Sequence, residues 1–211
     1  ANDDPAIASP PTDVTVTEDT ASNLDLSAAT FSDADSGANS ITLTFAAAAG
    51  TLTASSGGGV TVGGSGSATL TLSGTASVAD YQTALRSITY ENSSENPTAG
   101  SRTVNFTVSD GAWVSGDSRE VAVTSINDDP TNAGSLPTDL VFLQDTQGKL
   151  GLSSIDLSDV DANAGNLTLT ITSDNGHLQT LGWPGVTLGG SQSQLILTGN
   201  LTDLNDFLND V

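Results

Sequence analysis

The chain repeats itself, and this feature most constrains how it can fold. Pro11-Thr12-Asp13 recurs 126 positions later as Pro137-Thr138-Asp139. Asn2-Asp3-Asp4-Pro5 recurs 125 positions later as Asn127-Asp128-Asp129-Pro130. Self-similarity at a fixed spacing is the signature of tandem structural units. The sequence therefore predicts two copies of one domain, each introduced by the same short acidic linker.

Each copy is predicted to consist of short strands. Apolar residues alternate with polar ones, and clusters of Gly, Asp and Asn separate the alternating segments, as in a half-buried sheet. In the first copy the expected strands are Val14–Thr17, Asn23–Ser27, Ile41–Phe45, Ala68–Leu72, Arg102–Val108 and Glu120–Val123. Val78–Leu85 has helical spacing, but we interpret it as a plain crossover connection. The predicted fold class is all-β, with tandem Greek-key β-sandwiches.

The two copies are expected to differ in completeness. We place one complete repeat with its flanking linkers at residues 1–130 and an incomplete second repeat at residues 131–211. The second copy ends at Val211, which corresponds to Leu85, so it lacks counterparts of Arg102–Val108 and Glu120–Val123. We therefore interpret the chain as a piece of a longer protein and expect open strand edges in the second copy.

Charge limits the possible partners. The chain has 4 basic and 25 acidic residues, a formal net charge of −21, and no cysteine. We expect no nucleic-acid partner, because phosphate binding needs a basic surface. We expect no membrane insertion, because no apolar run of about 18 residues exists. Repulsion among so many carboxylates opposes compaction unless cations neutralise it, which favours a divalent ion.

Acidic residues recur where the predicted strands end. Glu18-Asp19 follows the first strand, Asp33-Ala34-Asp35 lies between the second and third, and Asp110-Gly111 lies between the last two. The linker Asn127-Asp128-Asp129-Pro130 adds a fourth acidic segment. Calcium takes six to eight oxygen ligands in flexible geometry, which loops of this kind can supply. The pattern predicts bound Ca²⁺ at the ends of the repeats.

The order of these motifs resembles that of cadherin repeats, and most of all the bacterial cadherin-like repeats of large surface adhesins. The resemblance implies two groups of metal ligands. The first group is Asn2, Asp3, Asp4, Asp33, Asp35 and Asp110; the second is Glu18, Asn127, Asp128, Asp129, Asp159 and Asp161. The sequence departs from the family at Gln144, which replaces the Glu of the second copy, and at Asp80, which is only a poor match to a further acidic motif of the family.

The function expected from these features is structural. We predict a calcium-dependent spacer or adhesive module of an extracellular, cell-surface protein, with neighbouring repeats of the same protein as its partners. A cell-surface glycan and another copy of the chain are alternative partners. Exposed Trp113 or Trp183 can stack on sugars, so a carbohydrate-binding module is a second hypothesis, and a surface-layer or fibre subunit is a third. We expect partial burial of both tryptophan rings.

No enzymatic activity is expected. The chain has a single histidine, His177, which we expect to be an exposed strand residue, and its carboxylates recur in both copies instead of converging on one site. A lone histidine builds neither a zinc site nor, without a recognisable nucleophile motif, a catalytic triad.

Overall fold

The computed structural model describes residues 3–8, 13–34, 41–98, 100–137, 141–162 and 165–210. The chain divides into two compact units, Ala1–Ile126 (unit 1) and Asn127–Val211 (unit 2). Asn2 and Asp35, two of the predicted metal ligands, lie outside the described residues. Strands dominate both units, so the prediction of an all-β fold is confirmed.

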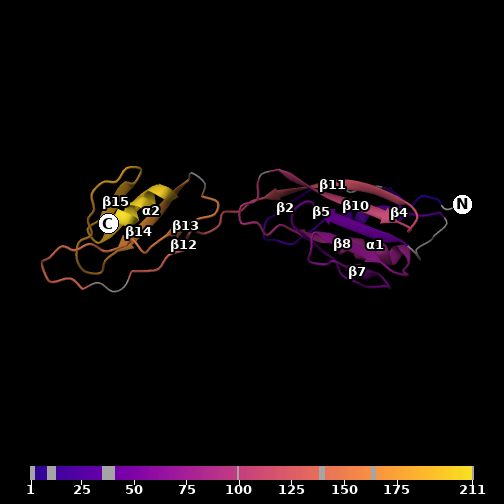
Figure 1. Cartoon of the computed structure of the whole chain (residues 1–211), viewed down its shortest axis with the longest axis horizontal. Coiled ribbons are helices and arrows are strands. Elements are labelled where there is room, and N and C mark those ends of the chain that lie inside the picture. Colours follow the sequence, from indigo (N-terminus) through magenta and orange to yellow (C-terminus); the bar gives the residue numbers. More distant parts are fainter. Residues whose placement is uncertain are drawn as a thin grey trace. The chain divides into compact units, whose positions relative to one another are not determined.

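Unit 1 is built from a large sheet, a smaller sheet and a short two-stranded pair (Figure 1). The large sheet has the strand order β2, β11, β10, β5, β8, β7. These strands are β2 (Val14–Thr17), β11 (Val114–Thr124), β10 (Ser101–Ser109), β5 (Thr42–Ala47), β8 (Thr69–Ser73) and β7 (Thr61–Gly63). All its neighbours pair antiparallel except β2 and β11, which are parallel.

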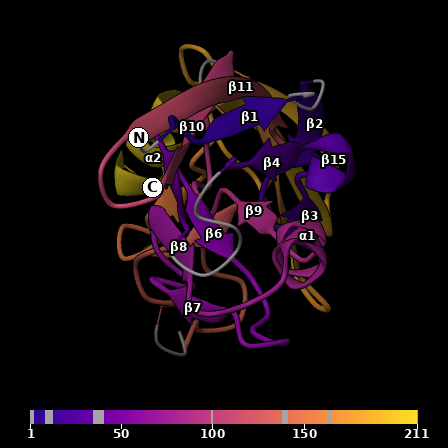
Figure 2. The same cartoon turned by 90° about the vertical axis from the view of Figure 1, so that its right-hand side faces the viewer.

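The smaller sheet of unit 1 places β9 between β3 and β6, as Figure 2 shows. Its strands are β3 (Ser22–Asn23), β9 (Thr89–Glu91) and β6 (Thr51–Thr53), and the separate pair is β1 (Ala6–Ala8) with β4 (Thr30–Ser32). The chain passes repeatedly between the sheets, so β5 pairs with β8 and with the distant β10. Such non-sequential antiparallel neighbours are typical of Greek-key sandwiches.

The core of unit 1 lies between these sheets, because alternate strand residues point inward. On β5, Leu43 and Phe45 are buried, and on β10 Val104, Phe106 and Val108 are buried. Phe45 stacks on Phe106, with ring centroids 6.1 Å apart, directly across the β5–β10 pairing. Alternation in the sequence thus located the inward face of both central strands.

The prediction for Val78–Leu85 is wrong, because α1 (Val78–Arg86) is a helix. Ser77 and Asp80 form a reciprocal capping box at its N-terminus, which satisfies backbone N–H groups that the helix cannot pair. Tyr81 anchors it by bringing its hydroxyl within 2.8 Å of the carbonyl oxygens of both Ile41 and Gly74. Asp80 therefore serves the helix cap in this structure.

The predicted strand Asn23–Ser27 is only partly correct. The strand β3 ends at Asn23, and a 3-10 turn spans Leu26–Ala28. Asp25 between them has a left-handed backbone with φ of 49°, and its N–H donates to the Asn23 side-chain oxygen at 2.6 Å. Leu24 and Leu26 are both buried, so the apolar alternation is real although the backbone turns.

Unit 2 repeats part of this design. Its sheet has the order β14 (Asn166–Thr172), β16 (Gln194–Asn200), β15 (Thr187–Ser191), and β12 (Thr131–Asn132) pairs with β13 (Leu157–Ser158). At the repeat offset, β14, β16 and β15 correspond to β5, β8 and β7. The described residues of unit 2 contain no strands corresponding to β10 and β11.

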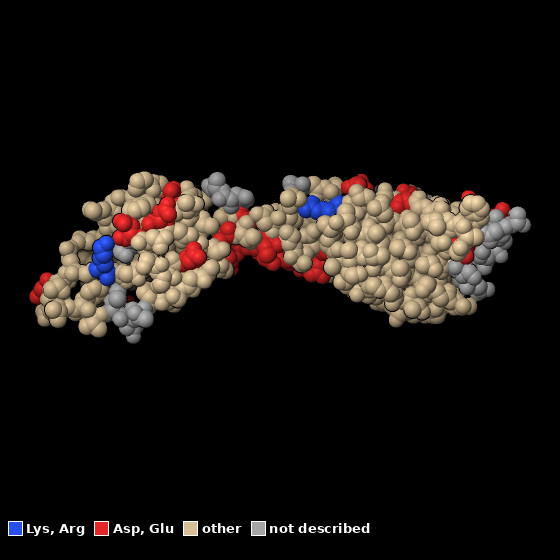
Figure 3. Space-filling view, in the orientation of Figure 1, with Lys and Arg blue, Asp and Glu red and all other residues tan. Residues whose placement is uncertain are grey.

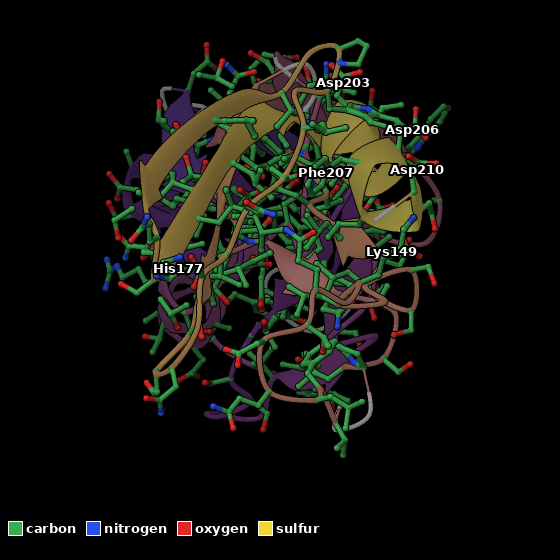
Figure 4. All side chains as sticks on the ribbon, turned by 90° about the vertical axis from the view of Figure 1, so that its left-hand side faces the viewer. Lys149, His177, Asp203, Asp206, Phe207 and Asp210 are labelled. Atoms are coloured by element: carbon green, nitrogen blue, oxygen red, sulfur yellow. The ribbon has the colours of Figure 1, made fainter. Side chains whose placement is uncertain are left out.

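The helix α2 (Leu201–Asp210) corresponds to α1 and covers the sheet of unit 2. It buries Leu204, Phe207 and Leu208, with the same three- and four-residue spacing as the buried residues of α1. Figure 4 shows Phe207 turned towards the sheet and Asp206 and Asp210 on the outer side of the helix. No helix within the described residues is long and apolar enough to cross a bilayer.

Candidate metal centre

Glu18 is the most unusual acidic residue of unit 1. It follows β2, and its backbone N–H continues the ladder to β11 by donating to the carbonyl of Thr124 at 3.0 Å. Its side chain is completely buried. Oε1 accepts a hydrogen bond from the N–H of Ile126, whereas the buried Oε2 has no hydrogen-bond partner among the described residues. A buried carboxylate with an unsatisfied oxygen is costly unless a cation or donor completes it.

Two further carboxylates lie at the same end of unit 1. Asp19, next to Glu18, adopts a left-handed backbone with φ of 54°, and its N–H donates to the carbonyl of Asn92 at 2.9 Å. This bond ties the turn after β2 to the loop after β9, which carries Glu95. A carboxylate oxygen of Asp19 lies within 4.8 Å of one of Glu95. Like charges this close repel, and a shared cation would relieve the repulsion.

The linker residue Asp128 contacts the D-x-D segment within unit 2 through its backbone N–H. Because β12 pairs antiparallel with β13, the residues before β12 run beside those after β13. The N–H of Asp128 donates to Oδ2 of Asp161 at 3.2 Å, and Oδ1 of Asp159 accepts from the N–H groups of Asp161 and Ala162 at 3.3 and 2.8 Å. The structure thus brings Asp128, Asp159 and Asp161 together, while Asn127 and Asp129 are exposed.

The N-terminal end of unit 1 has the corresponding strand pair. The pair β1–β4 matches β12–β13, so Asp33 follows β4 as Asp159 follows β13. Asp3 and Asp4 precede β1 and are exposed, whereas Asp33 and Asp110 are half-buried. Oδ1 of Asp110 accepts from the N–H groups of Ala112 and Trp113 at 2.8 and 2.7 Å, which holds the β10–β11 turn.

The basic residues do little to neutralise these acids. Arg102 donates to the backbone carbonyl of Thr98, Lys149 to that of Asp210, and Arg119 to that of Leu24. On the face drawn in Figure 3, Lys and Arg cover little surface, whereas Asp and Glu recur on both units. With 4 basic against 25 acidic residues, neutralisation has to come largely from ions in solution.

Arg119 on β11 is itself buried. Burial lowers the pKa of Arg119 from its usual value, and the charges of Asp13 and Asp25 oppose that shift. Arg119 lies five residues before Thr124, where β11 contacts Glu18, a separation of roughly 16 Å along an extended strand. Arg119 is therefore too far along the strand to compensate the Glu18 carboxylate.

The sequence pattern predicted neither Glu95 nor Asp19 as a metal ligand. Asp19 was visible as the second residue of the Glu18-Asp19 pair. Glu95 lies in the Asn- and Ser-rich loop 92–97. Its position just before Asn96-Pro97 was the one sequence feature that could have indicated a metal ligand. Only the fold shows that this loop meets the turn after β2.

The aromatic and histidine predictions have mixed outcomes. Trp183 is half-buried and meets Phe207 edge-to-face, with ring centroids 6.3 Å apart. Trp113 is 52% exposed, so the expected burial is seen for Trp183 and is less complete for Trp113. His177 is exposed as predicted, but it lies in the connection between β14 and β15 instead of in a strand (Figure 4).

Comparisons with known proteins return structural likenesses alone. No protein-family model matches the chain, and no curated protein matches it. The titin domains Z1Z2 in complex with telethonin are 12% identical over 95% of this chain and 83% of that chain, with a TM-score of 0.34. An endo-fucoidan hydrolase of glycoside hydrolase family 107 is 16% identical over 93% of this chain and 24% of its own, with a TM-score of 0.30.

Cadherin extracellular domains are among the similar structures. Protocadherin gamma B2 domains 1–5 are 18% identical over 95% of this chain and 32% of that chain, with a TM-score of 0.34. Drosophila N-cadherin EC1-4 is 16% identical over 97% of this chain and 42% of that chain, with a TM-score of 0.33. The chain thus spans less than half the length of these cadherin fragments. The assignment as an all-β sandwich rests on the strand pairing described above.

Proposed function

We propose that this chain is a calcium-stabilised structural and adhesive module of an extracellular surface protein. The observation that carries the proposal is Glu18, whose carboxylate is completely buried with one oxygen lacking a hydrogen-bond partner among the described residues. A divalent cation supplies both the missing ligand contact and the missing positive charge. Calcium suits this position because it binds carboxylate and carbonyl oxygens in variable geometry.

The ligands of this proposed ion come from unit 1 and from the linker. Unit 1 offers Glu18, with Asp19 and Glu95 beside each other. The linker begins directly after Ile126, whose N–H is bound by Glu18. The resemblance to cadherin repeats adds Asn127, Asp128, Asp129, Asp159 and Asp161 as proposed ligands of this ion.

A second site is proposed at the N-terminal end of unit 1. Asp3, Asp4, Asp33 and Asp110 are candidates there, because the pair β1–β4 has the geometry of β12–β13. This site would serve a neighbouring repeat of the same protein. Linker calcium would then fix the angle between successive repeats, and its removal would turn the linker into a hinge.

The module is proposed to have no catalytic role. Its carboxylates are divided between strand ends and helix caps, and they recur with the repeat. Reproducible hydrolysis of a glycan or peptide that one carboxylate substitution abolishes would contradict this proposal.

The test of the calcium proposal is calorimetric titration of the calcium-stripped chain with CaCl₂. We expect binding with dissociation constants on the order of 10⁻⁴ to 10⁻³ M, as in extracellular modules. Glu18→Gln should weaken one site at least tenfold. Asp117→Asn is the matched control, because Asp117 is an exposed carboxylate on β11 away from both clusters. Equal binding by wild type and Glu18→Gln would refute the proposed site.

Carbohydrate binding is the second candidate, and the exposure of Trp113 is the observation that favours it. Trp113 and Val114 are 52% and 67% exposed at the β10–β11 turn, where an indole face is available for stacking on a sugar ring. Binding on a glycan array that Trp113→Ala abolishes and Trp183→Phe preserves would support this function. Absence of any glycan signal would leave adhesion to repeats and copies as the function.

A further inference from the structure

A pocket of about 160 Å³ lies in unit 1 between the helix α1 and the loop that joins β6 to β7. Its lining, called the helix pocket, includes small and hydroxyl-bearing residues and one carboxylate: Ser55, Ser56, Gly57, Asp80, Thr83 and Ala84. Ser55, Ser56 and Thr83 are exposed, so the pocket can be reached from solvent. A cavity of about 150 Å³ admits a benzene ring, so the helix pocket has room for one six-membered ring.

Unit 2 has the same turn and the same helix at the equivalent place. One isolated bridge closes the turn in each unit, Gly57 with Val60 and Trp183 with Val186, at the repeat offset of 126. Within the helices the offset of the buried residues is 123, which matches Tyr81, Ala84 and Leu85 with Leu204, Phe207 and Leu208. Gly57 therefore corresponds to Trp183, and Ala84 corresponds to Phe207.

Two aromatic rings occupy the equivalent place in unit 2. Trp183 meets Phe207 edge-to-face there, with ring centroids 6.3 Å apart, and both belong to the apolar core of unit 2. Unit 1 has glycine and alanine at these two positions, and Ser55 stands where unit 2 has Leu181. Small and polar residues in unit 1 thus form a pocket where large apolar residues pack in unit 2.

The turn is held against the N-terminus of the helix in both units. Gly58 has a left-handed backbone with φ of 60°, and a Cβ at this position would collide with the carboxylate of Asp80. In unit 2 a Cβ at Gly185 would collide with the carboxylate of Asp203 in the same way. Glycine permits this close approach, so the walls of the helix pocket are fixed by the packing of the turn on the helix.

The helix pocket offers hydrogen-bonding groups that the fold does not use. Oδ2 of Asp80 accepts from the N–H and the hydroxyl of Ser77 at 3.1 and 2.6 Å, whereas Oδ1 has no hydrogen-bond partner among the described residues. The hydroxyl of Ser56 likewise bonds to no residue that the structure describes. Oγ1 of Thr83 donates to the carbonyl of Ala79 at 2.9 Å and keeps its lone pairs for a further donor. A ligand whose hydroxyl groups both donate and accept matches this set.

We propose that the helix pocket binds one neutral pyranose ring of a glycan. One sugar hydroxyl donates to Oδ1 of Asp80, others bond to Ser56 and Thr83, and the C–H groups of the ring lie on Gly57 and Ala84. The net charge of −21 favours a neutral sugar over an acidic one. The helix pocket and Trp113 lie on different elements, and the pocket contains none of the proposed calcium ligands, so this site is independent of both functions proposed above.

The probes are the methyl α-pyranosides of glucose, galactose and mannose, each titrated into the ¹⁵N-labelled full chain and followed by amide chemical shifts. At the efficiency usual for small ligands, a monosaccharide binds with a dissociation constant on the order of 1 to 10 mM. We expect saturable shifts of this strength at the amides of Ser56, Gly58 and Thr83 for at least one glycoside. EDTA in the buffer keeps the result separate from the calcium proposal.

Gly57→Trp locates the site by restoring the ring that unit 2 carries. A Cβ at Gly57 would meet no heavy atom within 4 Å, so the variant should fold, fill the helix pocket and weaken binding at least tenfold. Gly182→Trp is the matched control, because a Cβ there also meets nothing within 4 Å, and it should bind as the wild type does. Asp80→Asn should weaken binding about tenfold, since a hydroxyl bonds more strongly to a charged acceptor than to a neutral one. This second variant keeps the test decisive if Gly57→Trp does not fold.

Several results would overturn the proposal. The first is the absence of saturable shifts at the pocket amides up to about 100 mM of all three glycosides, at least tenfold above the expected dissociation constant. The second is equal binding by the wild type and a folded Gly57→Trp. Shifts confined to the surroundings of Trp113 would assign the sugar to that residue. Indole that titrates the pocket amides when the glycosides do not would show that the helix pocket takes an aromatic ring instead.

Discussion

Glu18→Gln should change the stability of unit 1 with opposite signs in the presence and absence of calcium. Glutamine keeps the Oε1 that accepts the N–H of Ile126 and replaces the unpartnered Oε2 with a neutral amide group. An uncompensated buried charge costs more than an unsatisfied amide. In EDTA the variant should therefore be at least as stable as the wild type.

Calcium should reverse this order. With a dissociation constant of about 10⁻⁴ to 10⁻³ M, 10 mM Ca²⁺ exceeds it about 10- to 100-fold. Linkage then stabilises the wild type by about 1.4 to 2.7 kcal/mol. For a unit of this size, about 1 kcal/mol shifts the melting temperature by about 4 °C. The wild type should gain about 5 to 10 °C, and the variant should gain far less.

Tyrosine near-ultraviolet circular dichroism is a suitable assay. Both tyrosines of the chain, Tyr81 and Tyr90, are buried in unit 1, so in a Trp183→Phe background the signal reports the melting of that unit. Asp117→Asn should follow the wild type in both buffers, and Mg²⁺ should stabilise less than Ca²⁺. The reasoning is refuted if Glu18→Gln lowers the melting temperature of unit 1 by the same amount in EDTA as in calcium. The Glu18 side chain would then act only through packing.

Three further predictions concern the helices and the linker. Tyr81→Phe should destabilise unit 1 by about 1 to 2 kcal/mol in urea, because the carbonyls of Ile41 and Gly74 lose their hydroxyl partner. Burial raises the pKa of Tyr81 above 10.0, so the folded state holds the phenolic proton more tightly than the unfolded state. The free energy of unfolding is therefore unaffected by this group below pH 10 and falls as the pH rises above 10. Tyr81→Phe should lack this fall at alkaline pH. Phe207→Ala should lower the free energy of unfolding of unit 2 by about 3 to 5 kcal/mol, because this ring is buried against the sheet. Trp183 fluorescence in a Trp113→Phe background measures this change. A decrease of less than about 1 kcal/mol would show that α2 does not stabilise the sheet. Small-angle scattering should show greater flexibility in EDTA than in calcium, and identical profiles would contradict the hinge.

Secondary-structure prediction succeeded where one pattern dominated the local sequence. The strands at Val14–Thr17 and Arg102–Val108 follow from alternation, which fixes the inward face of a strand whatever its neighbours are. It failed for Val78–Leu85, where the capping box of Ser77 and Asp80 was present in the sequence but was not considered. It failed also after Asn23, because a local Asx hydrogen bond turned the chain while the apolar alternation continued.

The repeat itself was determined by the sequence alone. Residue offsets gave the correspondence of β5 with β14 and of the two acidic linkers, because a duplicated fold preserves spacing between equivalent positions. The order of acidic residues along the chain could also be read directly. Which of them meet in space could be expected only by resemblance.

Tertiary structure decided the environment of each candidate. Glu18 and Asp19 are neighbours in sequence, yet Glu18 is fully buried and Asp19 is exposed, because successive residues at the end of a strand point in different directions. Glu95 joins them only because the N–H of Asp19 bonds to the loop after β9, at Asn92. Burial and unsatisfied hydrogen bonding depend on segments far apart in the chain, and no local pattern encodes them.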